Sequence, residues 1–354
     1  MEKKHPLLAR AQNQGTPLID GSTVIFVWEG ETAPFLLGDF SDWQRSELSD
    51  PLQTAPGVWI YTLTLPENAY IEYAYLTDIA ADQRILDPFN PRKITNGMGR
   101  FNQYFHMPDW SPSPLVRRQT GIPGGRITSA RLPTQGMIYG RVRAVHLYQP
   151  PVPGPYPLVL VWDGQDFLRR ACLPTILDNL IHQQQIQPLA LAMVESRGSV
   201  RMLEYACNDF SLDFVMEAVL PFAQQNLDLV AIDHQPGVYG VLGASMGGLM
   251  ALYSGLRLPG VFGKVLSLSG AFSFPAYDTI VFDLARFADP NTLRIWMDIG
   301  LFDMQHLLEC NRRLSAILQE RGFDIWYSEY PAGHNYTAWR VVIGAGFTHL
   351  FGRQ

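Results

Sequence analysis

The feature that most restricts the fold is an alternation of short apolar runs with helical stretches after Gly125. The apolar runs include "YPLVLVWDG", "PLALAMVES", "GVYGVLGAS" and "GKVLSLSGA", and most end in small or acidic residues. Stretches such as "LPTILDNLIHQQ" and "MQHLLECNRRLSAILQERG" separate many of them. Repeated strand–helix–strand order predicts a mostly parallel sheet with helices on both faces. We expect an antiparallel pair, "RITSARL" and "GRVRAVHLYQP", at its start.

The first part of the chain has a different pattern. Residues from about 22 to 107 form short alternating runs, such as "STVIFVW", "GVWIYTLTL" and "YIEYAYL", with turn-rich pieces between them. This spacing predicts an antiparallel β-sandwich. The segment "MPDWSPSPLVRRQTGIPGG" is typical of a linker. We therefore predict a sandwich with its linker over 1–118 and an α/β domain over 119–354. We expect the sandwich to adjust access to a pocket without supplying catalytic groups.

Composition narrows the function classes. Of the 354 residues, 47% are hydrophobic and 17% charged, which allows a large core. The net charge of −6 and the lack of a basic stretch argue against a nucleic-acid partner. We find neither a signal peptide nor an apolar run of the roughly 20 residues that a spanning helix needs. Cys172, Cys207 and Cys310 are odd in number and widely spaced, as expected of free thiols in a cytoplasmic protein.

A candidate nucleophile lies between a predicted strand and a predicted helix. The stretch "GASMG", from Gly243 to Gly247, fits G-x-S-x-G and separates "VYGVL" from "MGGLMALYSGL". A nucleophile elbow needs this context, because the serine occupies a strained turn that only small neighbours allow. The helix N-terminus also favours a negative oxygen. Ser245 is therefore the predicted nucleophile, against the alternative of an ordinary serine in a tight turn.

A serine needs a base and an acid that orients the base. In α/β-hydrolases the acid and then the histidine follow the serine in the chain. His334, in the loop after "IWYSEY", is the predicted base. For the acid, "LRIWMDIGLFDMQ" offers Asp303, in a loop past Gly300, and Asp298, within or at the edge of a strand. We favour Asp303, which could equally cap the helix that follows.

Two backbone amides should bind the oxyanion of the tetrahedral intermediate. One is the N–H of Met246, directly after the serine. The other should follow an early strand, and "LVLVWDGQDF" places Gln165 there, with Asp166 as the alternative. This chemistry needs no metal or organic cofactor.

The chain resembles enterochelin (ferric enterobactin) esterases of the esterase D-like branch of the α/β-hydrolases. The matching pieces are "LVWDGQDF", "RMLEYACNDF", "GASMGGLMALYSGL", "FGKVLSLSGAF" and "AGHNYTAWR". The resemblance implies an α/β-hydrolase preceded by a small Ig-like β-sandwich, whose end the "DPFNP" stretch resembles. The sandwich also resembles glycogen- and starch-binding modules, in which Phe40, Trp43 and Trp59 could stack on sugars. We expect these three rings to be core and edge packing instead.

The resemblance also implies a substrate and residues that bind it. Arg201, Glu204 and Asn208 match an R-x-x-E-x-x-C-N pattern, and Trp339 matches the end of G-H-x-x-x-x-W-R. An arginine could meet an anionic catecholate or carboxylate. Alternatively, Arg201 and Glu204 pair with each other and brace the loop. The implied partner is a small-molecule ester, with a ferric siderophore as one candidate.

Three functions remain open at this point. The main hypothesis is a serine carboxylic-ester hydrolase that works through an acyl-serine. A feruloyl-type or general acyl esterase, or an acyltransferase of the same fold, is the second. The third is a carbohydrate-binding protein with a non-catalytic hydrolase scaffold. The sequence does not indicate an oligomeric state.

Overall fold

The computed structural model describes residues 5–47, 50–97 and 99–353. It divides into two compact units. The first unit contains Met1–Ser111 together with two later segments, Gly300–Gln305 and Tyr330–Ala338. The second contains Pro112–Ile299, His306–Glu329 and Trp339–Gln354. The division falls within the segment expected as a linker, but the two later segments were not expected in the unit of the sandwich.

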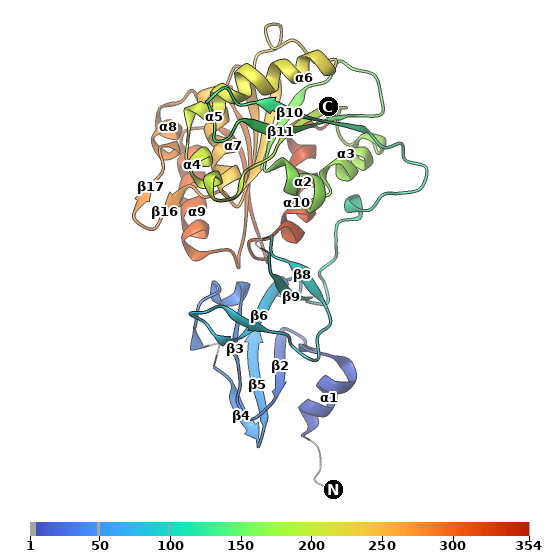
Figure 1. The fold of residues 1–354 in the computed structure, drawn as a ribbon, viewed down its shortest axis with the longest axis vertical. Coiled ribbons are helices and arrows are strands. Elements are labelled where there is room, and N and C mark those ends of the chain that lie inside the picture. The colour runs from blue at the N-terminus through green and yellow to red at the C-terminus, as the bar shows by residue number, and fades with distance from the viewer. Residues whose placement is uncertain (1–4, 48–49, 98, 354) are drawn as a thin grey trace. The chain divides into compact units, whose positions relative to one another are not determined.

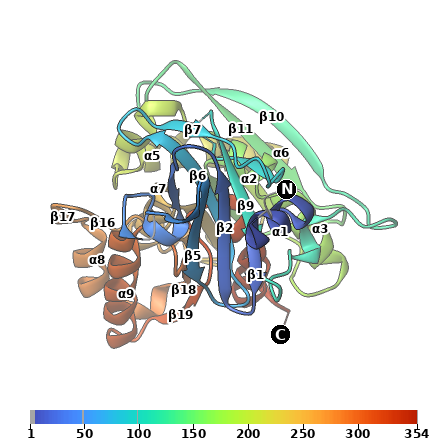
Figure 2. The same ribbon diagram turned by 90° about the horizontal axis from the view of Figure 1, so that it is seen from below.

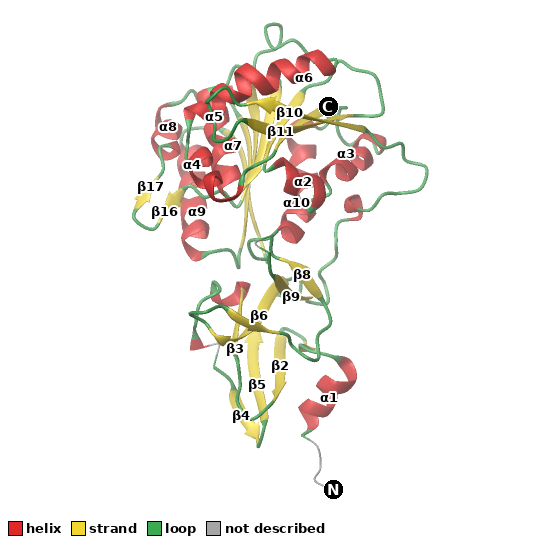
Figure 3. Ribbon diagram, viewed as in Figure 1, coloured by secondary structure: helices red, strands yellow, loops and turns green. Residues whose placement is uncertain are grey.

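Strands dominate the first unit (Figure 3). Its elements are α1 Pro6–Gln14, β1 Leu18–Asp20, β2 Thr23–Glu29, β3 Phe35–Gly38, β4 Leu52–Ala55, β5 Val58–Thr64, β6 Tyr70–Asp78, β7 Gln83–Ile85, β8 Lys93–Thr95 and β9 Phe101–His106. One sheet has the order β1-β2-β5-β4, and the other has the order β3-β6-β9-β8 with β7 paired to β6. All the paired strands are antiparallel.

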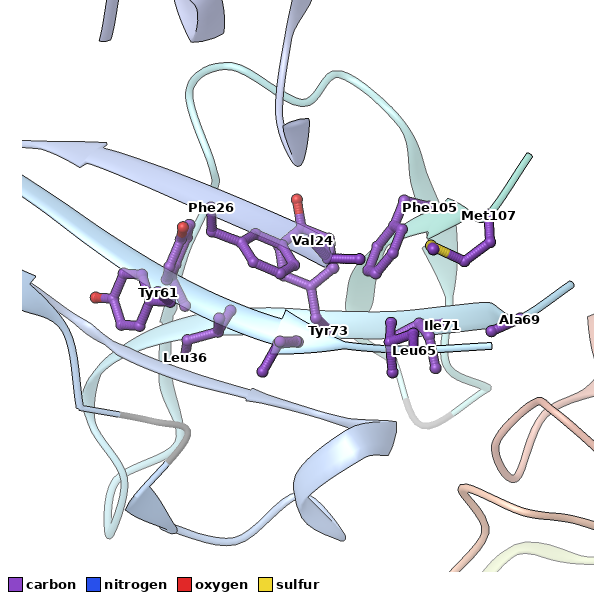
Figure 4. Close-up of a cluster of buried hydrophobic side chains, with 12 residues drawn as sticks. Val24, Phe26, Leu36, Tyr61, Leu65, Ala69, Ile71, Tyr73, Phe105 and Met107 are labelled. Atoms are coloured by element: carbon purple, nitrogen blue, oxygen red, sulfur yellow. The ribbon is translucent and has the colours of Figure 1, made fainter. Parts of the chain in front are cut away.

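The two sheets share one aromatic-rich core. Phe26 of β2 and Tyr61 of β5 come from the first sheet, and Tyr73 of β6 and Phe105 of β9 come from the second (Figure 4). The Phe26 ring meets the Tyr73 and Phe105 rings edge-on, with centroids 4.8 and 5.6 Å apart. Packing between two inner sheet faces defines a sandwich, so the predicted architecture of this part is confirmed.

The aromatic residues of the possible sugar platform have packing roles. Phe40 packs against the sandwich core. Trp43 packs beside Leu37, and its indole N–H donates to Asp39 over 3.0 Å. The Trp59 N–H donates to the Gly30 carbonyl over 3.0 Å. These contacts match the expectation of core and edge packing.

The second unit contains the elements of the α/β domain. Its strands are β10 Arg126–Pro133, β11 Val142–Gln149, β12 Leu158–Trp162, β13 Ala190–Val194, β14 Tyr239–Ala244, β15 Phe262–Leu268, β16 Ser273–Phe274, β17 Tyr277–Asp278, β18 Arg294–Gly300 and β19 Asp324–Tyr330. Its helices are α2 Gly164–Arg169, α3 Leu173–His182, α4 Arg201–Tyr205, α5 Asp209–Phe214, α6 Leu220–Asn226, α7 Met246–Arg257, α8 Val281–Phe287, α9 Gln305–Glu320 and α10 Tyr336–Phe351. Four of these elements (β18, β19, α9 and α10) have end residues that count with the first unit.

Eight strands form the central sheet, in the order β10-β11-β13-β12-β14-β15-β18-β19. Figure 1 labels β10 and β11, the first two strands of this order. The β10–β11 and β11–β13 pairs are antiparallel, and the pairs from β13 to β18 are parallel. The expected antiparallel pair and mostly parallel sheet are therefore confirmed. Figure 2 labels β10 and β11 at one end of this order and β18 and β19 at the other.

Helices lie on both faces of this sheet. Successive strand residues point to opposite faces. A Cβ on Gly255 of α7 would come within 2.4 Å of Val265 Cγ2, and a Cβ on Gly346 of α10 within 2.7 Å of Leu266 Cδ1. Since Val265 and Leu266 are neighbours in β15, α7 and α10 pack on opposite faces, as the strand–helix alternation predicted.

Some elements differ from the pattern expected from the sequence. The stretch predicted as one helix, "SLDFVMEAVLPFAQQNL", contains α5, a π-helical segment Val215–Val219 and α6. Helix α1 was not predicted. None of the helices in the described part of the chain is long and apolar enough to cross a membrane.

Candidate active site

Ser245 occupies the turn between β14 and α7. Its backbone has φ 59° and ψ −123°, a conformation that residues other than glycine rarely adopt. The turn is held at both ends, because Ser245 N–H donates to Leu268 O over 2.9 Å and Ser245 O accepts from Ala271 N–H over 3.0 Å. Ser245 is partly exposed although its neighbours are buried. The strained strand–turn–helix geometry predicted for a nucleophile elbow is therefore present.

Close backbone packing explains the glycines around the serine. A Cβ on Gly243 would lie 2.1 Å from Gly247 O, and a Cβ on Gly247 would lie 3.0 Å from Asp163 Oδ2. Larger residues would push α7 away from the end of β14. The G-x-S-x-G spacing is thus a steric requirement of this turn.

The two backbone amides expected to bind the oxyanion lie in the first turns of two helices. Met246 is the first residue of α7, so its N–H has no acceptor within that helix. Gln165 is the second residue of α2, and its side chain makes two hydrogen bonds with Ser196, to Ser196 Oγ over 2.8 Å and from Ser196 N–H over 2.9 Å. The amide of Asp166, the alternative donor, already donates to Asp163 O over 2.9 Å. This favours Gln165 over Asp166.

Arg201 is held beside the elbow by a bidentate ion pair. Its Nε and Nη2 donate to the Asp163 carboxylate over 2.7 and 2.6 Å, and Nη2 also lies 3.3 Å from Ala244 O. The Arg201 side chain is 25% exposed and that of Asp163 only 2%. The guanidinium thus ties the loop after β12 to the residue before Ser245. The sequence had suggested Glu204 as an alternative partner and had missed Asp163, although Asp163 lies in the "DGQ" motif.

The Tyr205 ring packs against the guanidinium of Arg201. The Arg201 guanidinium lies 5.1 Å from the centre of its ring, within the range of a cation–π contact. The Tyr205 hydroxyl accepts from Asp163 N–H over 3.0 Å. Burial, and next the Asp163 carboxylate, raise the pKa of Tyr205 well above its ordinary value, so the hydroxyl stays neutral.

The remaining expected substrate residues have partners within the protein. Glu204 is buried and pairs with Arg143 over 2.7 and 2.8 Å. Asn208 caps α5, where its Oδ1 accepts from Phe210 N–H over 2.9 Å. Trp339 is buried and donates to Ser269 Oγ over 2.9 Å. These contacts within the protein are enough to explain why a carboxylate, an amide and an indole occur at these three positions, with no need for a ligand.

Asp303 and His334 form a hydrogen-bonded pair in the first unit. His334 Nδ1 lies 2.8 Å from Asp303 Oδ1 and 3.0 Å from Oδ2. The Asp303 side chain is fully buried, and that of His334 is 22% exposed. Asp303 Oδ1 also accepts from Met304 N–H over 2.7 Å. A proton on Nδ1 that faces the carboxylate leaves Nε2 as the basic nitrogen.

Asp298 lies elsewhere, inside β18. It is completely buried, and its Oδ2 accepts from the Trp296 indole over 2.7 Å. The strand continues to Gly300, so Asp303 falls in the loop, as the sequence suggested. The structure thus pairs His334 with Asp303 and gives Asp298 a different partner.

The fold, the elbow and the Asp–His pair define the chain as an α/β-hydrolase. The chain belongs to an esterase family: the family model described as "Putative esterase" matches residues 137–350. It is an esterase that is similar to iron(III) enterobactin esterases.

Similar proteins include two kinds of curated relatives. The iron(III) enterobactin esterase of Escherichia coli strain CFT073 is 25% identical over 291 residues, covering 76% of this chain and 68% of that protein. The strain K12 enzyme of the same name is 27% identical over 203 residues, covering 55% of this chain and half of its own length. The uncharacterized protein YbbA of Bacillus subtilis is 27% identical over 209 residues, 51% of this chain and 80% of YbbA.

Solved structures support the fold. The ferric enterobactin esterase of Salmonella typhimurium aligns with a TM-score of 0.76 at 22% identity, over 93% of both chains. The Shigella flexneri enterobactin esterase, crystallised in the presence of enterobactin, aligns with a TM-score of 0.75 at 21% identity, over 93% of this chain and 92% of that one.

Proposed function

We propose that this protein is a serine carboxylic-ester hydrolase whose substrates are siderophore esters. The strained turn at Ser245 carries the proposal, because a strand–helix elbow is the arrangement in which α/β-hydrolases present a nucleophilic hydroxyl. The Asp303–His334 pair supplies an oriented base in support. The siderophore class is taken from the relatives named iron(III) enterobactin esterase.

The proposed mechanism uses an acyl-enzyme. Ser245 Oγ attacks the ester carbonyl while His334 Nε2 accepts its proton. The Asp303 carboxylate stabilises the imidazolium through Nδ1–H, and the amides of Met246 and Gln165 stabilise the oxyanion. Collapse breaks the bond to the alkoxy group, and the imidazolium protonates the leaving alcohol. Water then attacks the acyl-serine with His334 as base, which releases the acid and restores the serine.

Two further parts of the proposal concern binding and location. Arg201 is the residue that we expect to touch an anionic substrate, because a quarter of its side chain is exposed beside the elbow. Glu204, Asn208 and Trp339 would then shape the pocket through their own partners.

We also propose that the sandwich is Ig-like, and that the protein is cytoplasmic and binds no nucleic acid. The three cysteines are free thiols, in keeping with a reducing compartment.

A fluorophosphonate probe and a panel of esters test the function. We expect the protein to label at Ser245 and to hydrolyse a catecholoyl-serine triester faster than a feruloyl ester. Ser245→Ala should abolish labelling and lower turnover by roughly 10⁴- to 10⁶-fold. A preference for the feruloyl ester would move the assignment to the second hypothesis, and no labelling or hydrolysis would favour a non-catalytic scaffold.

Ser129 provides a matched control. Its Oγ lies 2.7 Å from His146 Nδ1, and His146 Nε2 lies 2.9 Å from Glu195 Oε1, so this serine also contacts a histidine and an acid. It lies within strand β10 rather than at an elbow. Ser129→Ala should keep normal labelling and turnover. Loss of labelling in this variant, with Ser245 intact, would contradict the elbow argument.

A further inference from the structure

The loop that carries His334 pairs with the sandwich. Tyr70 begins β6, and its N–H donates to Pro331 O over 3.0 Å. Tyr70 also forms an isolated parallel bridge with Ala332. The side chains of Tyr70 and Ala332 belong to one buried apolar cluster with Ala338. The backbone on the N-terminal side of His334 is therefore attached to the first strand residue of β6.

Asp39, the residue directly after β3, packs against the residue before the histidine. The carboxyl is buried and accepts from Glu72 N–H over 2.8 Å and from the Trp43 indole over 3.0 Å. A Cβ on Gly333 would lie 2.1 Å from Asp39 Cγ and under 2.5 Å from both carboxyl oxygens. Only glycine fits there while Asp39 keeps this position.

The loop that carries Asp303 is attached to the same unit. Phe302 packs against the core of the sandwich. Phe302 N–H also donates to Ala332 O over 3.1 Å, and Leu301 N–H donates to Tyr330 O over 2.7 Å. The loops of the acid and of the histidine are thus bonded to each other as well as to the sandwich.

Asp39 is buried beside other acidic groups. Burial raises the pKa of this carboxyl well above its ordinary value, and the nearby carboxylates of Glu72 and Asp303 raise it further. The hydrogen bonds from Glu72 N–H and Trp43 act in the opposite direction. A buried acid next to other acids costs stability compared with an apolar residue of the same size.

We propose that Asp39 of the sandwich is a positioning residue, which holds the Gly333 backbone so that His334 stays paired with Asp303. This inference rests on the proposed function, since it assigns the pair to catalysis. It also changes the role expected for the sandwich, which would help to build the active site rather than only adjust access to it.

Steric coupling between positions 39 and 333 tests the proposal in the full-length protein. The variants are Asp39→Ala, Asp39→Asn, Gly333→Ala and the double variant Asp39→Ala/Gly333→Ala. Gly260→Ala is the matched control, because a Cβ on Gly260 meets nothing within 4 Å. The measurements are kcat and KM on a small activated ester, and the downfield proton resonance of an imidazole Nδ1–H bonded to a carboxylate. Circular dichroism checks folding.

We expect Asp39→Ala and Gly333→Ala each to lower kcat by about 10²-fold, the cost of misplacing a catalytic group by about 1 Å, with KM nearly unchanged. The resonance should shift or disappear in both. Asp39→Asn keeps the volume against Gly333 and should retain most of the turnover. The double variant should lose no more than the worse single variant, and Gly260→Ala should behave as wild type.

Two results would overturn the proposal. One is wild-type turnover and resonance in Gly333→Ala, which stands whether or not Asp39→Ala folds. The other is a double variant whose loss equals the product of the two single losses, which would show that the positions act independently. The resonance depends on neither Ser245 nor any substrate. A failed positioning role is therefore distinguishable from a failed assignment of the nucleophile.

Discussion

The buried ion pair between Arg143 and Glu204 permits a quantitative prediction. Arg143 lies on β11 and Glu204 on α4, the helix that begins with Arg201. Their side chains are 4% and 6% exposed. Two charge-assisted hydrogen bonds of 2.7 and 2.8 Å join them, and Arg143 also donates to Glu195 O over 3.0 Å. The pair therefore anchors the segment that holds Arg201 beside the elbow.

Arg143→Met removes one charge and leaves the other buried. Each charge-assisted bond contributes about 1.5–3 kcal/mol. Breaking a buried pair from one side costs about 3–5 kcal/mol, since the remaining carboxylate cannot be solvated. We expect a loss of this size in the free energy of unfolding. Turnover should also fall, because α4 carries Arg201.

Chemical denaturation followed by helix circular dichroism measures this loss, because most helices lie in the second unit. Arg143→Met/Glu204→Gln removes both charges and keeps an acceptor for the Tyr139 amide, which donates to Glu204 over 3.0 Å. This double variant should recover most of the stability. Arg257→Met is the control, because its pair with Asp209 is 45% and 57% exposed and contributes at most about 1 kcal/mol. A loss in Arg143→Met as small as that of the control would refute the reasoning.

Two other predictions concern the acid and a thiol. Asp303→Asn should lower kcat by on the order of 10⁴-fold, whereas Asp298→Asn should mainly affect stability through its bond to Trp296. Steady-state kinetics of both folded variants checks this ranking. The reverse ranking would assign the acid to Asp298. Burial, with a smaller contribution from the Asp209 carboxylate, raises the pKa of Cys207 to about 12, so its thiolate forms only as the pH approaches that value. Alkylation of Cys207 in the native protein should be far slower than that of a free thiol at neutral pH, and equal rates would contradict this environment.

The sequence by itself determined the parts of this protein that depend on neighbouring residues. Apolar runs separated by helical stretches predicted the mostly parallel sheet, because each run can be buried only when helices cover both faces. The small residues around Ser245 predicted the elbow, since the turn is too tight for larger ones. The chain order of serine, acid and histidine led to Asp303 and His334, which the structure shows as a hydrogen-bonded pair. Their catalytic role remains a prediction.

Only the tertiary structure decided which distant residues meet. Arg201 and Glu204 are three positions apart, a spacing that allows a pair on one helix, yet each has a partner far away in the chain. The partners are Asp163 and Arg143, 38 and 61 positions distant. The approach of Asp39 to Gly333 is likewise long-range. No local pattern encodes such contacts, because they depend on how separate sheets and loops pack, and that packing places two short loops of the hydrolase in the compact unit of the sandwich.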